Sequence, residues 1–146
     1  ETIVVTAEHQ RDWDRGNRLE ARGIEDLAKA QRELVRRSAD VVNFQNRRDT
    51  SMARAENAQR TFDNLVANPS VADAKDAREW AKLLEEVASD WESNAERMEE
   101  ADRDLERALR RKTNAETEVV EAQSKIDEGR AQMAQAERAS RLVSSR

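Results

Sequence analysis

The stretch that decides the fold runs from residue 101 to residue 136 and reads ADRDLERALRRKTNAETEVVEAQSKIDEGRAQMAQA. Small or apolar residues recur in it in alternating steps of four and three, and most positions between them are charged or polar. This heptad repeat is typical of a helix that packs along one seam against another helix. The repeat extends back to Ala77, and we expect one helix over about residues 71–143. Its seam positions are Ala77, Trp80, Leu84, Val87, Trp91, Asn94, Met98, Ala101, Leu105, Ala108, Lys112, Ala115, Val119, Ala122, Ile126, Gly129, Met133 and Ala136.

A second, rougher repeat precedes it and predicts a helix over about residues 8–67. Arg37, Arg48 and Ser51 interrupt its apolar seam, and its continuation towards the start predicts a weaker N-terminal part. The seam positions are Trp13, Gly16, Glu20, Gly23, Leu27, Ala30, Leu34, Arg37, Val41, Phe44, Arg48, Ser51, Ala55, Ala58, Phe62 and Leu65.

Between the two repeats lies the only proline, Pro69, which disfavours helical geometry at the preceding residue. Ser70 with Asp73 three residues later is compatible with a helix N-cap. We therefore predict a tight turn over residues 68–70 and an all-α fold, a long antiparallel two-helix coiled-coil hairpin with an extended N-terminal tail. The alternative is a three- or four-helix bundle, with helix breaks near residues 49–51, 89–90 and 113.

Composition agrees with a thin helical assembly. Of 146 residues, 39% are charged, 37% hydrophobic and 3% aromatic, and 23 are alanine. A thick globular core and a mixed-fold catalytic domain are disfavoured, because globular chains carry about 45–50% apolar residues. The absence of cysteine excludes disulfides and thiolate metal sites. The mixed charge predicts no nucleic-acid partner, and no stretch has the roughly 20 apolar residues of a membrane span.

Charge suggests how the two helices pair. A fold at residue 69 would bring opposite charges together where the numbers of facing residues add up to about 138, as with Asp26 and Lys112, or Arg48 and Asp90. In that arrangement the second helix extends beyond the first by about 15 residues, or about 20 Å. This overhang predicts a homodimer surface that contains Gly129, Ala136 and Ser140.

Few residues are candidates for chemistry. His9, the only histidine, is expected at an exposed helix start, and no Glu-x-x-His pair indicates a di-iron site. Trp80 and Trp91 occupy seam positions, with Arg48 predicted near Trp91 as a cation–π partner. Asn94 and Lys112 are polar seam residues of the kind that fix register. We expect no enzyme, no cofactor and no metal.

Residues 1–7 are the one stretch that helical packing does not explain. Glu1-Thr2-Ile3-Val4-Val5-Thr6-Ala7 is rich in β-branched residues, and an isolated strand can be completed by the edge of a partner's sheet. The segment resembles the TonB box of TonB-dependent outer-membrane transporters, a short acidic-Thr-aliphatic-Val-Val-Thr-Ala segment. This resemblance implies that residues 2–6 bind the periplasmic domain of TonB as an added strand. The implied partner-binding residues are Thr2, Ile3, Val4, Val5 and Thr6.

The rest of the chain does not resemble these transporters. We therefore expect a non-enzymatic periplasmic interaction or spacer protein of a Gram-negative bacterium, which begins at Glu1 as a mature form or as an excised fragment. Colicin-type bacteriocins also combine TonB-box-like segments with long helical hairpins. A receptor-binding or translocation hairpin of a secreted bacteriocin is thus one alternative, and a purely structural coiled coil of the cytoplasm is another.

Overall fold

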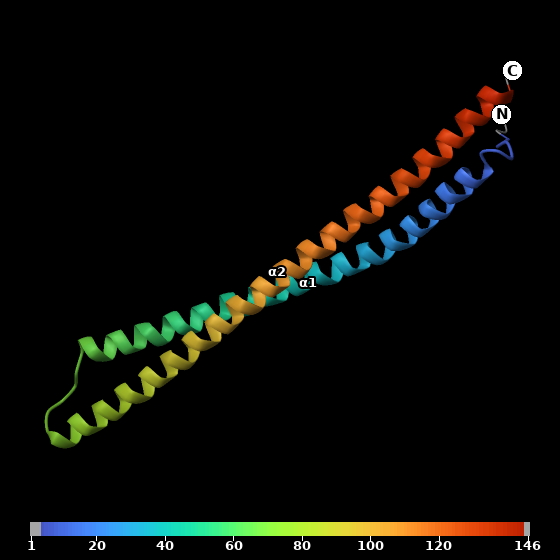
Figure 1. Cartoon of the computed structure of the whole chain (residues 1–146). Coiled ribbons are helices and arrows are strands. Elements are labelled where there is room, and N and C mark those ends of the chain that lie inside the picture. The colour runs from blue at the N-terminus through green and yellow to red at the C-terminus, as the bar shows by residue number, and fades with distance from the viewer. Residues whose placement is uncertain (1–3, 145–146) are drawn as a thin grey trace. The chain divides into compact units, whose positions relative to one another are not determined.

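The structure, a computed structural model, describes residues 4–144 and contains two long helices (Figure 1). Helix α1 is Gln10–Ala67 and helix α2 is Ala74–Ser144. No strand occurs within residues 4–144, so the predicted all-α two-helix hairpin is confirmed. Both helices continue without a break through residues 49–51, 89–90 and 113, and the alternative of a three- or four-helix bundle is therefore wrong.

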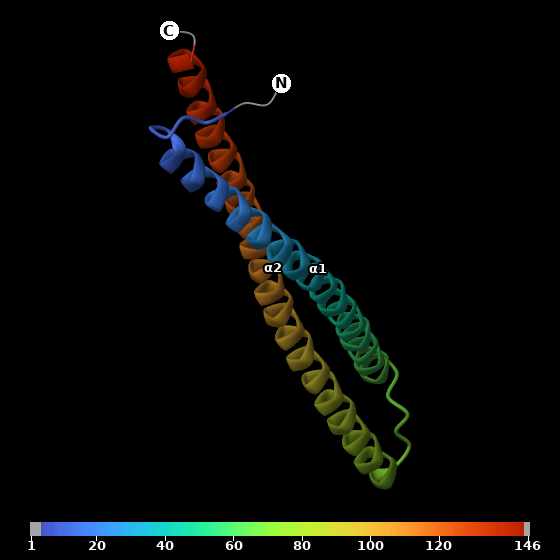
Figure 2. The same cartoon turned by 90° about the vertical axis from the view of Figure 1, so that its right-hand side faces the viewer.

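The chain forms two compact units. The terminal unit is Glu1–Ser38 with Arg111–Arg146, and the loop unit is Ala39–Arg110. In each unit a stretch of α1 packs antiparallel against a stretch of α2, and the two helices lie side by side in both views (Figures 1 and 2).

Local hydrogen bonds define where the helices begin and end. The amide of Trp13 donates to the carbonyl of His9 at 3.1 Å, which starts α1 after a turn over residues 7–9. Helix α1 ends at Ala67, as predicted from Pro69. Helix α2 begins at Ala74, where the Asp73 carboxylate accepts the amide of Asp76 at 2.8 Å and acts as the N-cap. The prediction of Ser70 as the N-cap is wrong, and the connection covers residues 68–73.

The predicted seams are confirmed in both units. Every buried residue within residues 4–141 lies at one of the predicted seam positions, except Ser140, which continues the α2 seam four residues after Ala136. In the terminal unit these are Gly16, Gly23, Ala30, Ala115, Ala122, Ile126, Gly129, Ala136 and Ser140. In the loop unit they are Val41, Ala55, Ala58, Asn94, Ala101 and Ala108.

Most of these side chains are small, so the helix backbones approach closely in the terminal unit. A Cβ atom placed on Gly129 would lie 2.6 Å from the amide nitrogen of Glu20 and 2.6 Å from the carbonyl oxygen of Gly16. A Cβ atom on Gly23 would lie 2.8 Å from the Ile126 side chain. The N-terminal part of α1, predicted to be weak because of its glycines, is thus where those glycines allow the closest packing.

The predicted register is wrong. In the terminal unit the cross-helix ion pairs are Glu20–Arg130 at 2.9 Å and Asp26–Lys125 at 3.0 Å. In the loop unit Arg48 pairs with Asp102 at 2.7 Å. The numbers of facing residues add up to about 150 in all three pairs, whereas charge matching at a tight turn predicted about 138.

Seam matching does not separate the two registers. Ala30 would face the seam residue Ala108 at the predicted register, and it lies beside the seam residue Ala122 in the structure. Since an exposed ion pair is worth only about 0–1 kcal/mol, charge matching alone does not fix the register either.

The connection accommodates this register within the loop unit. At the register of the Arg48–Asp102 pair, Ala67 would lie opposite about residue 83, and the first nine residues of α2, about 14 Å of helix, would extend past the end of α1. Residues 68–73 can span about 20 Å when extended, which covers that offset. The indole of Trp80 donates to the carbonyl of Leu65 at 3.3 Å, near the end of α1.

The predicted overhang of α2 does not exist, because Thr6 contacts Ser140 near the end of that helix. Gly129, Ala136 and Ser140, on which the homodimer prediction rests, are buried in the terminal unit of the chain itself.

The close approach of the two helices can be tested by replacing Gly129, because the predicted change in the free energy of unfolding has the opposite sign from that at an exposed glycine. Replacing an exposed helical glycine by alanine stabilises a helix by about 1 kcal/mol. Gly129→Ala is expected instead to lower the free energy of unfolding by about 1–3 kcal/mol, because the new methyl group overlaps the backbone of α1. Urea unfolding followed by circular dichroism measures this. Ala131→Gly, at an exposed position two residues on, is the control, because it measures only the difference in helix propensity between alanine and glycine. A Gly129→Ala chain that is more stable than the natural chain would refute the close approach.

The register is testable by cross-linking, since the chain has no cysteine of its own. Asp26→Cys with Lys125→Cys should react rapidly with a short bifunctional thiol reagent, because these side chains meet in the structure. Asp26→Cys with Lys112→Cys is the matched control. Lys112 lies 13 residues, about 20 Å, along α2 from Lys125 and should not cross-link. Preferential cross-linking of the control pair would restore the predicted fold at residue 69.

Candidate functional site

The predicted partner-binding segment lies before α1. Thr2 and Ile3 are outside the described residues. Val4, Val5 and Thr6 have no regular secondary structure, and among the side chains described, Val4 is the most exposed large apolar one, at 77%. Val5 and Thr6 are half-buried.

Thr6 is held against the last turns of α2. Its amide donates to the hydroxyl oxygen of Ser140 at 3.1 Å, and the two hydroxyl groups are 3.3 Å apart. Ser140 is completely buried and its hydroxyl donates to the carbonyl of Ala136 at 2.8 Å. The carbonyl of Thr6 accepts the amide of His9 at 3.0 Å. Both backbone polar groups of Thr6 are therefore engaged within the chain.

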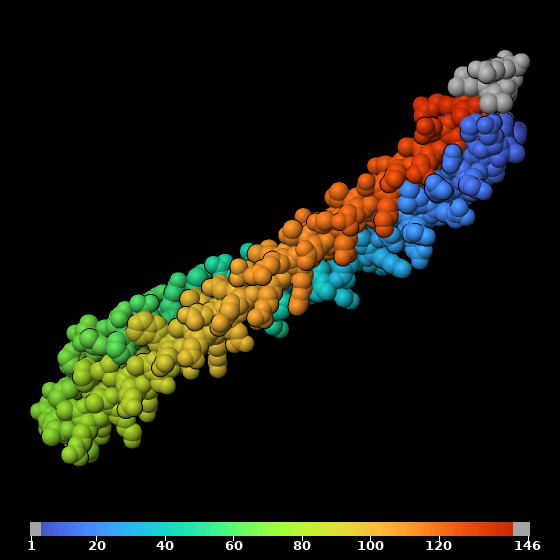
Figure 3. Space-filling view, viewed as in Figure 1, coloured from blue at the N-terminus to red at the C-terminus, as the bar shows by residue number. Residues whose placement is uncertain are grey.

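The start of α1 continues this contact. The indole of Trp13 donates to the Glu137 carboxylate at 3.2 Å, and the first turns of α1 lie against the last turns of α2 (Figure 3). A groove of about 380 Å³ runs alongside, with His9, Arg15 and Ala136 among its lining residues. His9 is half-buried, so the prediction of an exposed histidine is wrong.

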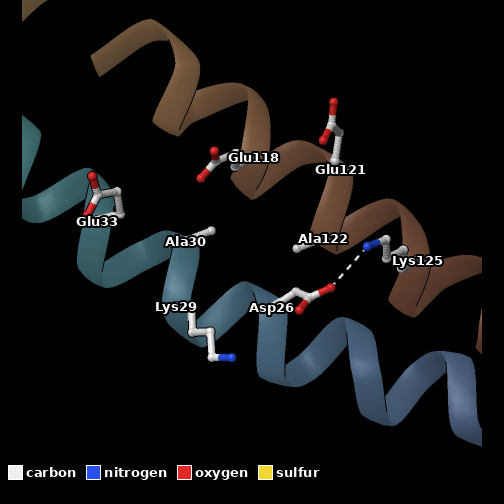
Figure 4. Close-up of a pocket in the computed structure, with 8 residues that line it drawn as sticks. All are labelled: Asp26, Lys29, Ala30, Glu33, Glu118, Glu121, Ala122 and Lys125. Carbon is white, nitrogen blue, oxygen red and sulfur yellow. Dashed lines mark hydrogen bonds and ion pairs between the residues drawn. The ribbon is translucent and has the colours of Figure 1, made fainter. Parts of the chain in front are cut away.

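A groove of about 480 Å³ in the terminal unit is lined mainly by charged side chains (Figure 4). Ala30 and Ala122 form its floor because both seam positions are small, and Glu33 and Glu118 project from opposite helices. Lys125 donates to Asp26 across one end at 3.0 Å. The groove therefore follows from an alanine seam between long charged side chains.

The ion pair in this groove shifts the ionisation of Asp26. The hydrogen bond from Lys125 is the main cause that holds the pKa of the Asp26 carboxyl below its ordinary value of 3.8. A depressed carboxyl pKa favours the folded chain above pH 3.8, and this contribution is lost as the pH falls through the lowered pKa.

The aromatic and polar seam residues differ from prediction in their partners. Trp91 packs against Phe62, with ring centroids 5.5 Å apart and ring planes at 40°. The predicted Arg48–Trp91 cation–π pair is wrong, because Arg48 binds Asp102, while Arg47 lies 5.3 Å from the Phe44 ring centroid. The amide of Asn94 donates to the carbonyl of Asp90 at 2.8 Å, in its own helix.

Sequence reasoning missed Ser140 as the partner of Thr6. Ser140 was expected only as a small seam residue of a homodimer surface. Its position, four residues after Ala136, continues the seam of α2, but no signal in the sequence links it to Thr6.

Comparisons with protein-family models, with curated proteins and with solved structures find no match to this chain. Within residues 4–144, no helix is long and apolar enough to span a membrane. In the same part of the chain, no three His, Asp or Glu side chains group closely enough to hold a metal ion.

Asp26 gives a pH-dependent prediction. Asp26→Asn should lower the thermal midpoint of unfolding at about pH 6, where the ion pair with Lys125 is intact. The difference from the natural chain should shrink as the pH falls below 3.8 and disappear once Asp26 is protonated. Circular dichroism melts at several pH values measure this, with the exposed Asp63→Asn as control. A difference that stays constant down to about pH 2 would show that the ion pair does not carry the effect.

Proposed function

We propose that this chain is a non-enzymatic periplasmic interaction protein whose N-terminal segment binds the periplasmic domain of TonB by strand addition. The observation that carries the proposal is the sequence Glu1-Thr2-Ile3-Val4-Val5-Thr6-Ala7, which resembles a TonB box. Strand addition takes its affinity from main-chain hydrogen bonds and its specificity from alternate side chains. β-Branched residues suit that role because they fit a pleated surface.

The placement of the described part of the segment supports the proposal. Val4 to Thr6 lie outside both helices, so their backbone groups are not part of a helical hydrogen-bond ladder. The exposed Val4 side chain is free to enter a pocket beside a sheet edge. The helical hairpin acts in this proposal as a spacer that presents the segment.

A second candidate is the receptor-binding or translocation hairpin of a colicin-type bacteriocin. The two-helix hairpin favours it, because such bacteriocins combine long helical hairpins with TonB-box-like segments. A toxic domain encoded downstream in the same reading frame, or a neighbouring immunity gene, would distinguish it from a spacer protein. A purely structural coiled coil is the third candidate and predicts no TonB binding.

Binding of the TonB periplasmic domain, measured by calorimetry on the 146-residue chain, tests the proposal. Deletion of residues 1–7 should abolish binding, and binding that survives this deletion would overturn the proposal. Val120→Asp alters an exposed valine of α2, 68% accessible, and should leave affinity unchanged.

A pair of proline substitutions tests the binding mode. Successive amides of a strand point in opposite directions, so only every second amide can pair with a single sheet edge. Val4→Pro and Val5→Pro each remove one amide donor, and only one of the two should weaken TonB binding by about tenfold or more. Equal affinity losses for both variants would contradict strand addition.

A further inference from the structure

Thr6, the last residue of the implied partner-binding set, is hydrogen-bonded to Ser140 of α2. The single hydroxyl proton of Ser140 goes to the carbonyl of Ala136, so its oxygen is left to accept hydrogen bonds. That oxygen accepts the Thr6 amide at 3.1 Å and lies 3.3 Å from the Thr6 hydroxyl, which can donate to it. Because Ser140 is completely buried, this acceptor has a fixed position.

The contact conflicts with strand addition at Thr6. A residue that joins a sheet edge offers its amide and carbonyl to the partner strand. The amide of Thr6 is bound to Ser140, and its carbonyl is bound to the amide of His9 at 3.0 Å. A strand of TonB therefore cannot pair through Thr6 unless the chain first releases these bonds.

We propose that the Thr6–Ser140 contact regulates the N-terminal segment, so that the last turns of α2 hold it closed and TonB binds the opened form. The inference rests on the proposed function. The apparent affinity for TonB is reduced by the fraction of chains that are closed. Loss of two neutral hydrogen bonds should change the ratio of open to closed chains by about tenfold or more.

The closed state is measurable without TonB, by amide hydrogen exchange of Thr6 in NMR spectra of the 146-residue chain. The Thr6 amide should exchange at least several-fold more slowly than an unstructured amide, and Ser140→Ala should remove that protection. Ser140→Ala leaves a helix-favouring residue in α2, so the helix is expected to remain intact. Ser124→Ala changes an exposed serine of the same helix and should leave Thr6 protected. An unprotected Thr6 amide in the natural chain, or protection unaffected by Ser140→Ala, would overturn the inference.

TonB affinity tests the regulation itself. Ser140→Ala should bind the TonB periplasmic domain about tenfold more tightly than the natural chain. Lost protection without tighter binding would refute the regulation. Absence of binding by both the natural and the Ser140→Ala chains would overturn the proposed function, and the exchange experiment would then still decide whether the closed state exists.

Discussion

The structure of the terminal unit depends on how closely α1 and α2 approach each other. Gly16 and Gly129 leave no room for a Cβ atom between the two backbones. None of the three glycines has a positive φ, so their role here is to provide space and not to form a turn. Alanine seams bury little area per residue, but close approach brings backbone atoms into van der Waals contact, and many weak contacts add up. This packing explains how two helix stretches can pair in the terminal unit of a chain with 39% charged residues.

Seam packing and ion pairs contribute differently to the register of the two helices. The alanines of α2 repeat every seven residues, so a slip of seven residues would still place Leu27 on an alanine seam. The same slip would place Glu118, in place of Lys125, opposite Asp26, and two like charges would then meet. Packing thus limits the pairing to registers that match seam to seam, and the ion pairs disfavour the slip of seven residues.

This division explains what could be predicted from the sequence. The all-α fold, the end of α1 and the seam positions follow from heptad periodicity and Pro69, which are local signals. The register could not be predicted from charge alone, because 57 charged side chains offer many pairings of similar weak energy. The offset of the two helices depends on the extended connection over residues 68–73, which the assumption of a tight turn at Pro69 excluded.

At the candidate site too, local sequence signals could be interpreted, but a contact between distant residues could not be predicted. Residues 1–7 could be singled out because their composition differs from the rest of the chain, whereas the contact between Thr6 and Ser140 joins residues 134 positions apart. The Thr6–Ser140 contact forms only at the observed register. Whether the N-terminal segment is free to bind a partner therefore depends on how the two helices pack along their seam.

Nuclear Overhauser effects between the Hα protons of Gly16 and Gly129 test the close approach most directly. The structure predicts strong cross-peaks between the two glycines, because their backbones are in contact. A spectrum without these cross-peaks, with effects from Gly16 to residues near 122 instead, would contradict the close approach and the register built on it.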